Sequence, residues 1–262
     1  MKIKNLETIP LAIPFNHGGK DAGFDGQNWE KLSFLLVKLE MESGIIGWGD
    51  CFSYNCMLSV KYALDTMIKP NVVGKKVLNI PSFMKEMQKI LNLFGRNGIL
   101  QYAFSGLDIA LWDAQAKELG VPLCDALGGA LRKSFVGYSS LYRYGDSEIV
   151  AEKCAQSMNN GYRSIKLHEI DPKIVKVARE ICGDGFPLMV DTNCPWDFDQ
   201  ALEIGLAMKP YDIFWLEEPI FPPEDFASLA RLQEKLGIPL AAGENACTAL
   251  EFGRMIDSNA VS

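Results

Sequence analysis

Four short runs in the second half of the sequence decide its fold class: SIKLH (164–168), PLMVD (187–191), IFWLE (213–217) and PLAAGE (239–244). Each run is rich in residues that favour strands, and each ends in a polar or charged side chain. A similar run, FVGYSS (135–140), precedes them. Helical patterns follow the five runs in turn, at 147–159, 172–181, 198–208, 223–235 and 247–256. Repeating βα units of about 25 residues predict parallel strands with right-handed crossovers.

The first half of the sequence is organised differently and predicts an α+β domain. Strand-like patterns cover 2–13, 32–40 and 45–49, and helical patterns lie near 56–70, 80–93 and 100–119. The turn Ser43-Gly44 between the second and third strands predicts a hairpin.

Two segments of this half have further features. The third helix places Phe104, Leu107, Leu111 and Ala114 on one face, and Gly120 is placed to end it. The Gly-rich polar segment NHGGKDAGFDGQN (16–28) predicts a mobile loop.

These patterns predict two domains, an α+β domain over 1–130 and a (β/α) barrel of the TIM type over 131–262. Polar residues at the C-terminal ends of the strands are typical of the site-bearing edge of such a barrel. An open doubly wound sheet is the alternative arrangement of the same α/β units. Only about five βα units fit into the sequence, whereas a closed barrel has about eight, so the expected barrel is partial.

The composition excludes several classes of protein. With 262 residues, of which 48% are apolar, the chain can bury a sizeable core. A net charge of −7, with no Lys/Arg run longer than two residues, argues against a nucleic-acid or anionic membrane surface. No apolar run approaches the ~20 residues of a membrane span, and the first residues lack a secretory signal. Seven cysteines without a CxxC pair favour a reducing, cytoplasmic location.

Three acids end three consecutive predicted strands: Asp191, Glu217 and Glu244. Adjacent parallel strands lie about 4.8 Å apart, so these carboxylates are expected to converge. Unpaired carboxylates repel one another and raise each other's pKa, and a hard divalent cation such as Mg²⁺ removes that cost. For any one of the acids, capping of the next helix or simple exposure to solvent is an equally good explanation. Three in register favour a metal site.

Lys166 and His168 lie at the end of SIKLH, the second of the five predicted strands. Their i, i+2 spacing places both side chains on one face of that strand. Alone, Lys166 could be a structural ion pair and His168 a hydrogen-bonded core imidazole. Together, opposite an acid cluster, they are candidate catalytic bases. Asn193 could orient a metal-bound water or the substrate. Glu218 alternates away from Glu217 and either pairs with Lys166 or is structural.

The sequence resembles the enolase superfamily in its mandelate racemase / muconate lactonizing enzyme branch. The resemblance rests on GLDIALWDAQAKELGVPLCDALGG (106–129) and on the strand-end motifs SIKLH, VDTN, WLEEP and GEN, in the expected order. It implies that the α+β domain is a capping domain, with 16–28 as its lid loop over the mouth of the barrel. It also implies a homo-oligomer.

The resemblance implies roles for individual residues. Asp191, Glu217 and Glu244 match the Mg²⁺ ligands. Lys166 and His168 fall on the family's KxK motif, with His168 as the base and Lys166 as its electrostatic partner, or with these roles exchanged. His17 matches the specificity loop in position only, and an exposed loop histidine is the alternative. The KxH pattern and the polar strand-end residues favour a polyhydroxylated acid sugar as the substrate; these residues are Ser139, Ser140, Tyr142 and Arg143.

The implied reaction removes the proton α to a carboxylate, with Mg²⁺ stabilising the enediolate that forms. Dehydration or cycloisomerisation of an acid sugar is the leading prediction. A racemase or epimerase using the same residues is the first alternative. The second is a non-catalytic remnant or interaction protein, because family members carry more barrel after the GEN strand. A fragment of a longer enzyme is the favoured explanation, ahead of a premature stop and of completion by partner chains.

Overall fold

The computed structural model describes residues 1–19 and 30–262. The chain divides into two compact units. The first contains Met1–Phe15 and Lys31–Ser134, and the second contains Phe135–Ser262 together with the described part of Asn16–Glu30. Each unit has its own core of buried apolar side chains. Most of the predicted loop 16–28 lies outside the described residues.

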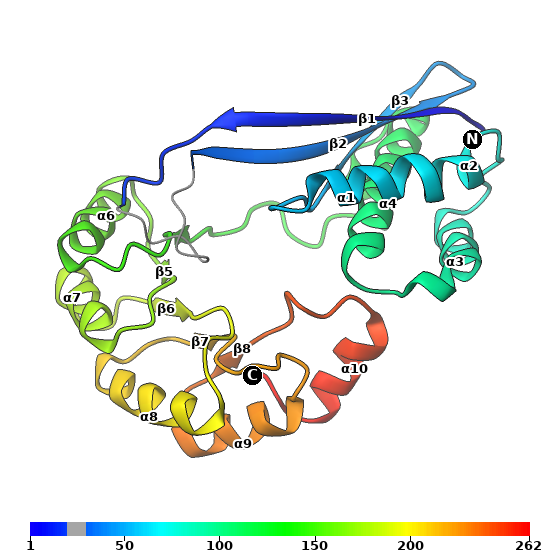
Figure 1. Cartoon of the computed structure of the whole chain (residues 1–262). Helices are drawn as coiled ribbons and strands as arrows, with labels where there is room; N and C mark the ends of the chain where they lie inside the picture. Colours follow the sequence, from blue (N-terminus) through cyan, green and yellow to red (C-terminus); the bar gives the residue numbers. More distant parts are fainter. Residues whose placement is uncertain (20–29) are drawn as a thin grey trace. The chain divides into compact units, whose positions relative to one another are not determined.

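In the first unit, strands β1, β2 and β3 form an antiparallel sheet in that order (Figure 1). Their bounds are β1 (Ile3–Pro14), β2 (Lys31–Met41) and β3 (Ile46–Cys51). The hairpin predicted at Ser43-Gly44 is confirmed, because β2 and β3 pair directly and Gly44 has a φ of 86°. A positive φ is strained for most residues and is readily adopted by glycine.

Helical elements make up the rest of the first unit, and those at 57–63, 64–68 and 98–119 pack against this sheet. The helical elements are α1 (Met57–Ala63), a π-helical turn (Leu64–Ile68), α2 (Lys69–Val72), α3 (Ile80–Ile90), a 3₁₀ turn (Asn92–Phe94), α4 (Gly98–Leu119) and α5 (Leu123–Ala126). The predicted apolar face of α4 is confirmed, since Phe104, Leu107, Leu111 and Ala114 are all buried. Gly120 ends α4 in the left-handed conformation, as predicted.

Strand β3 approaches α4 so closely that only glycine fits at the contact. A Cβ atom on Gly49 would lie 2.0 Å from the carbonyl oxygen of Gly106, and one on Gly47 would lie 2.0 Å from that of Ala110. Both obstacles are helix backbone, which cannot move aside as a flexible side chain would. The glycines of β3 therefore set the distance between the sheet and its longest helix.

We predict that Gly49→Ala destabilises the first unit by roughly 2 kcal/mol, because the added methyl group must push β3 away from α4. Urea unfolding followed by circular dichroism measures the change. Gly253→Ala is the control, since a Cβ on Gly253 meets nothing within 4 Å and the residue lies in a helix. An unchanged unfolding midpoint for Gly49→Ala would contradict the close-packing argument.

In the second unit, strands β4 to β8 form one parallel sheet whose order follows the sequence. The strands are β4 (Ser139–Ser140), β5 (Ile165–Leu167), β6 (Leu188–Asp191), β7 (Leu216–Glu217) and β8 (Leu240–Ala241). A doubly wound sheet reverses its strand order at a switch point, and β4 to β8 do not reverse. Their carboxyl ends therefore succeed one another along a single edge.

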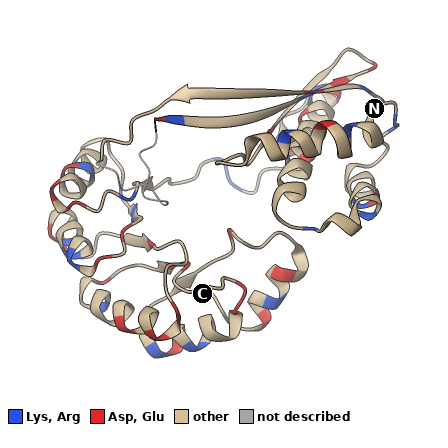
Figure 2. Ribbon diagram, in the orientation of Figure 1, with Lys and Arg blue, Asp and Glu red and all other residues tan. Residues whose placement is uncertain are grey.

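A helix follows each strand of this sheet, and Figure 1 shows α6 to α9 along one side of the strands. The helices are α6 (Ser147–Asn159), α7 (Pro172–Cys182), α8 (Phe198–Met208) with a 3₁₀ turn (Lys209–Tyr211), α9 (Phe226–Leu236) and α10 (Ala249–Asp257). Figure 2 shows acidic and basic residues interspersed along them. None of the described helices is both long and apolar enough to cross a bilayer.

The side chains that cap these helices are not the strand-end acids. Helices α6 to α10 begin at Asp146, Asp171, Asp197, Asp225 and Thr248, each of which accepts a backbone N–H of the first turn. The capping explanation offered above for the strand-end acids is therefore wrong for Asp191, Glu217 and Glu244. Exposure to solvent, the other alternative, fits only Glu244 of these three, since Asp191 is buried and Glu217 is partly buried.

Candidate active site

The register of the parallel sheet brings two of the strand-end acids together. Asp191, the last residue of β6, pairs with Glu217, the last residue of β7, and Glu217 pairs in turn with Ala241 of β8. Asp191 is 1% exposed, whereas Glu217 is only partly buried. Two carboxylates on neighbouring strands of a buried edge need a positive counter-charge.

Lys166 supplies a positive charge to both carboxylates. Its ammonium group, Nζ, lies 2.9 Å from Asp191 Oδ2 and 3.0 Å from Glu217 Oε1. Burial alone would lower the pKa of Lys166, but the hydrogen bonds to the two carboxylates outweigh burial and raise it. The buried Lys166 of the predicted site is therefore paired with two of the predicted metal ligands.

His168 lies beside the same carboxylate in a defined orientation. Its Nδ1 contacts the carbonyl oxygen of Leu141, and its Nε2 lies 3.2 Å from Asp191 Oδ2. A carbonyl oxygen can only accept, so Nδ1 carries a hydrogen and Nε2 is the nitrogen directed at the site. Lys166 and His168 thus converge on Asp191, as their i, i+2 spacing predicts.

The carboxyls at this edge have opposite pKa shifts. Burial raises the pKa of Asp191, but the hydrogen bonds from His168 and Lys166 outweigh burial and lower it. Burial, followed by the negative charges on Asp191, Glu218 and Glu217, raises the pKa of Glu244. The negative charge around Glu244 is therefore only partly compensated by the chain's own cations.

The donor set at this edge fits Mg²⁺. Asp191, Glu217 and Glu244 offer hard carboxylate oxygens, and their mutual repulsion is the field that a divalent cation neutralises. The side chains are not gathered around one point: among the described residues, no three His, Cys, Asp or Glu side chains stand ready to hold a metal ion. Lys166 instead occupies the space between Asp191 and Glu217 as their counter-charge.

The turn after each of β6 and β7 has left-handed residues. Asn193 and Cys194 have φ of 55°, and Glu218 has φ of 48°. The buried Glu218 carboxylate accepts hydrogen bonds from the Gly243 amide at 2.8 Å and from the Cys194 thiol at 3.2 Å. Of the two roles offered for Glu218, these contacts favour the structural one, which links the ends of β6, β7 and β8.

The predicted substrate residues Tyr142 and His17 contact each other through their rings. The ring centroids are 6.3 Å apart in an edge-on arrangement, and His17 stacks on Tyr144 with centroids 6.0 Å apart. The exposed-loop alternative for His17 is wrong, because its side chain is 5% exposed. Neither of its ring nitrogens has a hydrogen-bond partner within the described ranges 1–19 and 30–262.

At this edge, sequence reasoning missed the roles of Trp215 and Glu169, and it named Arg143 only as a polar strand end, without its contacts. The indole N–H of Trp215 donates to Glu217 Oε2 at 2.9 Å, and their i, i+2 spacing on one strand could have revealed the contact. Glu169 is 1% exposed and accepts the Tyr144 amide at 2.7 Å. Arg143 donates to the ends of two strands. Glu169 and Arg143 contact backbone groups that are far from them in the sequence. No sequence pattern indicates such contacts.

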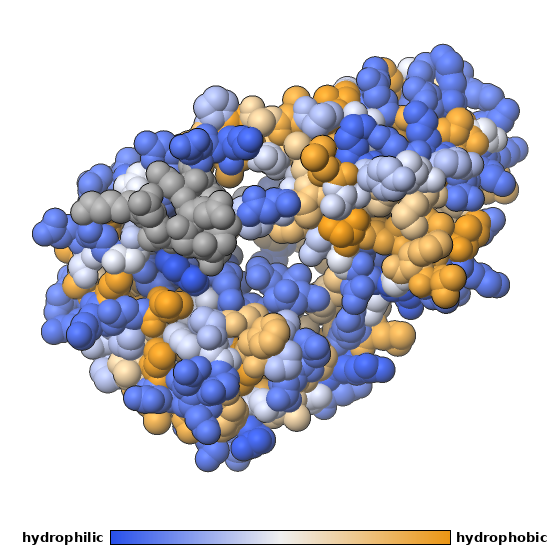
Figure 3. Space-filling model, viewed as in Figure 1, coloured by the Kyte–Doolittle hydropathy of each residue, from blue (hydrophilic) through white to orange (hydrophobic). Residues whose placement is uncertain are grey.

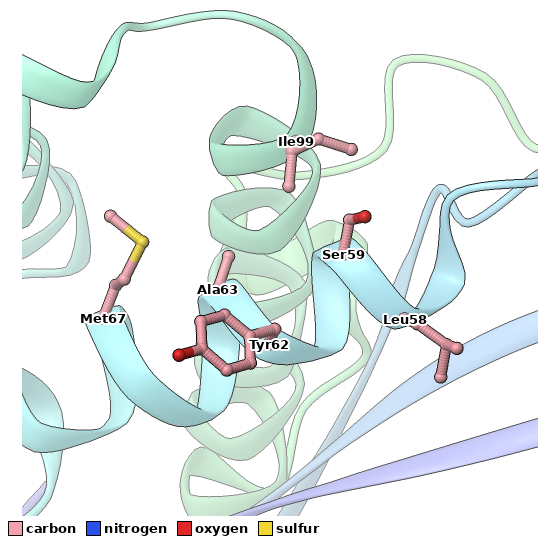
Figure 4. Close-up of a pocket in the computed structure, with 6 residues that line it drawn as sticks. All are labelled: Leu58, Ser59, Tyr62, Ala63, Met67 and Ile99. Carbon is pink, nitrogen blue, oxygen red and sulfur yellow. The ribbon is translucent and has the colours of Figure 1, made fainter.

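A hollow in the first unit has a different character. It encloses about 450 Å³, and Figure 4 shows its lining from α1, the turn that follows and the start of α4. The lining residues are Leu58, Ser59, Tyr62, Ala63, Met67 and Ile99. Figure 3 shows apolar side chains gathered around this part of the unit. Its lining has one hydroxyl and one phenol and no charged side chain, unlike the sheet edge described above.

The family of this chain follows from comparison with known proteins. The model for the mandelate racemase / muconate lactonizing enzyme N-terminal domain matches residues 27–128, and the enolase C-terminal domain-like model matches residues 149–262. The chain belongs to the enolase superfamily, in its mandelate racemase / muconate lactonizing branch. Membership confirms the resemblance drawn from the strand-end motifs, and with it the α/β fold with an N-terminal capping domain and a parallel sheet.

Individual members of the superfamily match over almost the whole chain. An arabinonate dehydratase from Saccharolobus solfataricus is 30% identical over 271 residues, covering 99% of this chain and 72% of the relative. A racemase from Streptomyces coelicolor, solved with bound magnesium, has a TM-score of 0.90 at 26% identity, covering 99% of this chain and 74% of that chain. Other relatives are cycloisomerases and epimerases.

A further match is an L-talarate/galactarate dehydratase variant solved with magnesium and L-glucarate. It has a TM-score of 0.87 at 28% identity, covering 99% of this chain and 68% of that chain. The chain thus spans about 70% of the lengths of these three relatives.

We predict that Glu244→Gln raises the unfolding midpoint at pH 7 in the absence of divalent cations, because it removes a carboxylate whose charged form is disfavoured in the folded protein. A raised carboxyl pKa means that the wild type loses stability as the pH rises from the ordinary value of 4.5 through the raised value. Glutamine does not titrate. The two stability curves therefore meet in acid and separate at neutral pH.

Urea unfolding between pH 4 and pH 8 measures this difference, which is small because solvent reaches the exposed Glu244 and screens its charge. Added Mg²⁺ should stabilise the wild type more than Glu244→Gln, since a ligand stabilises the state that binds it. Glu224→Gln, at another exposed position, is the matched control. A lower midpoint for Glu244→Gln at pH 7 without cations would show that Glu244 is held by favourable contacts instead.

Proposed function

We propose that this protein catalyses the Mg²⁺-dependent removal of the proton α to the carboxylate of an acid sugar, leading to dehydration. The observation that carries the proposal is the convergence of Lys166 Nζ and His168 Nε2 on Asp191 at the carboxyl edge of the sheet. Candidate proton-transfer groups and carboxylates share one edge there. The dehydratases among the relatives support this reaction class.

His168 is the better candidate for the base. Its Nδ1 is engaged by the Leu141 carbonyl, which fixes the ring and directs Nε2 at Asp191 on the carboxylate edge, where a proton could be transferred to or from the substrate. The Lys166 ammonium donates to two carboxylates and is suited to holding negative charge on the substrate carboxylate. The exchange of roles between these two residues is the alternative.

Mg²⁺ would be held by Asp191, Glu217 and Glu244 and would stabilise the negative charge that develops on the substrate carboxylate as the proton leaves. Two surrounding contacts would keep these ligands in place. The Trp215 indole holds Glu217 Oε2, and the Asn193 amide N–H donates to Asp191 Oδ1 at 3.1 Å.

Dehydration is favoured over racemisation because the candidate bases come from one strand. Racemisation needs proton transfer on both faces of the α-carbon, whereas Lys166 lies in β5 and His168 directly follows it, and both converge on Asp191. Cycloisomerisation also starts with removal of this proton, so relatives with that activity are consistent with the proposal. A cytoplasmic location and a homo-oligomer stay predictions.

We predict that His168→Asn abolishes exchange of the α-proton with solvent while leaving Mg²⁺ affinity within about twofold of the wild type. Asparagine removes the base but leaves the three carboxylates in place. The measurement is deuterium incorporation at the α-carbon of a library of acid sugars in D₂O, with and without Mg²⁺. Lys176→Met, on the exposed face of α7, is the control.

Each outcome of this experiment separates the candidate functions. Loss of water identifies dehydration, whereas inverted configuration without loss of water identifies a racemase or epimerase. Persistent exchange in His168→Asn would make Lys166 the base. Absence of Mg²⁺-dependent exchange across the library would contradict the proposed function and favour the non-catalytic alternative.

His17 is proposed as a substrate-binding residue, because a buried imidazole with two unsatisfied nitrogens costs stability unless a ligand uses them. We predict that His17→Phe raises the unfolding midpoint of the free protein and weakens acid-sugar binding about tenfold. Phenylalanine keeps the stacking on Tyr144 and removes the nitrogens. Isothermal titration with the sugar and thermal unfolding without it measure both effects. Unchanged binding would make His17 a packing residue.

A further inference from the structure

Arg143, in the loop after β4, ties together the ends of two neighbouring strands. Its Nε donates to the carbonyl oxygen of His168 at 2.6 Å, just beyond β5. Its Nη2 donates to the carbonyl oxygen of Thr192 at 2.8 Å and to Oδ1 of Asn193 at 3.2 Å, just beyond β6. One planar guanidinium therefore sits against the backbone of the proposed base and against the side chain of a proposed substrate residue.

The chemistry of the guanidinium fixes the direction of the Asn193 amide. Arginine only donates hydrogen bonds, so the atom of Asn193 that faces Nη2 is the amide oxygen. The amide nitrogen then points away with its two N–H groups. It has no hydrogen-bond partner among residues 1–19 and 30–262, and it is not one of the fully buried polar atoms.

The backbone of Asn193 is fixed as well. The residue adopts the left-handed conformation, with φ of 55°, and its backbone N–H donates to Asp191 Oδ1 at 3.1 Å. The preceding Thr192 is held by its own N–H and hydroxyl on the Glu217 and Glu218 carbonyl oxygens. With backbone and amide oxygen both engaged, the NH₂ group is the part of Asn193 left for a ligand.

The loop that carries Arg143 is itself anchored. The buried carboxylate of Glu169 accepts the backbone N–H groups of Tyr144 at 2.7 Å and of Gly145 at 3.2 Å. Its negative charge also attracts the Arg143 guanidinium. Glu169 thus fixes the backbone that directly follows Arg143, while the Arg143 guanidinium holds Asn193.

We propose that Arg143 is a positioning residue that makes Asn193 a hydrogen-bond donor to an oxygen of the substrate. The ligand class that suits a pair of fixed N–H donors is a carboxylate or hydroxyl oxygen of the acid sugar. This choice of ligand rests on the proposed function, whereas the orientation of Asn193 rests on the contacts of Arg143 alone. Without Arg143, the amide is free to turn and can present its oxygen instead.

The orientation can be tested without substrate. In the full chain labelled with ¹⁵N at asparagine side chains, we expect an order parameter of about 0.8 for the Asn193 NH₂ group in the wild type and below about 0.6 in Arg143→Met. Backbone order parameters in β5 and β6 should not change. An Asn193 side chain that stays equally rigid in Arg143→Met would overturn the proposal.

Two further variants keep this test decisive. Arg143→Lys retains a positive charge beside Glu169 but has one donor nitrogen in place of the guanidinium fork, so it should also loosen the amide, and it serves if Arg143→Met does not fold. Arg231→Met is the matched control, because Arg231 stacks on Phe198 at 4.5 Å and lies exposed on α9. The control should leave the Asn193 signal unchanged.

A binding experiment then tests the consequence for the substrate, with galactarate and Mg²⁺ as the probe. Arg143→Met and Asn193→Ala should each weaken galactarate binding about tenfold, and the double variant should be no weaker than either single one. Additive losses, about a hundredfold together, would overturn the positioning role. Failure of the wild type to bind galactarate or any other acid sugar in the library would count against the proposed function, while the order parameters still decide the orientation.

Discussion

The second unit depends on one compact set of charges, the Lys166 ammonium between Asp191 and Glu217. Three ionisable groups at a buried sheet edge would each be costly alone, and the sheet can keep them there because each compensates another. The same arrangement leaves Glu244 in an excess of negative field, which raises its pKa. The positive charge of Lys166 therefore compensates the Asp191 and Glu217 carboxylates but not the Glu244 carboxylate. A divalent cation bound at this edge would neutralise the remaining negative charge.

Much of the fold could be predicted from the sequence because hydrophobic periodicity reports burial directly. The apolar face of α4 and the alternation of strands and helices in the second unit follow from residues three to four apart or two apart. Strand lengths could not be predicted in this way. The run 239–244 contains only a short paired strand, β8 (Leu240–Ala241). Pairing depends on how far the neighbouring strand extends, and a single apolar run does not contain that information.

The candidate site shows the same limit in its polar residues. Lys166, His168, Asp191 and Glu217 were predictable because each lies within one residue of the end of a strand, and parallel strands carry their last residues to one edge. Glu169 was not predictable as part of the site, and Arg143 was predictable as a polar strand end but not by its contacts. Arg143 is bonded to carbonyl oxygens 25 and 49 residues away, and every residue has a carbonyl. Only the folded backbone decides which carbonyls an arginine can reach.

The left-handed residues at the strand ends connect these observations. Asn193, Cys194 and Glu218 all have positive φ, a conformation that glycine adopts at little cost and that strains other residues. Glycine at position 193 would relieve the strain but would remove the amide that Arg143 holds. Glycine at position 218 would remove the carboxylate that binds the Gly243 amide. In both turns, keeping the side chain means tolerating the backbone strain. The hydrogen bonds that link the ends of β6, β7 and β8 offset this strain. Rigid turns of this kind fix the direction of the neighbouring Asp191 and Glu217 carboxylates, so the strain and the proposed chemistry occupy the same few residues.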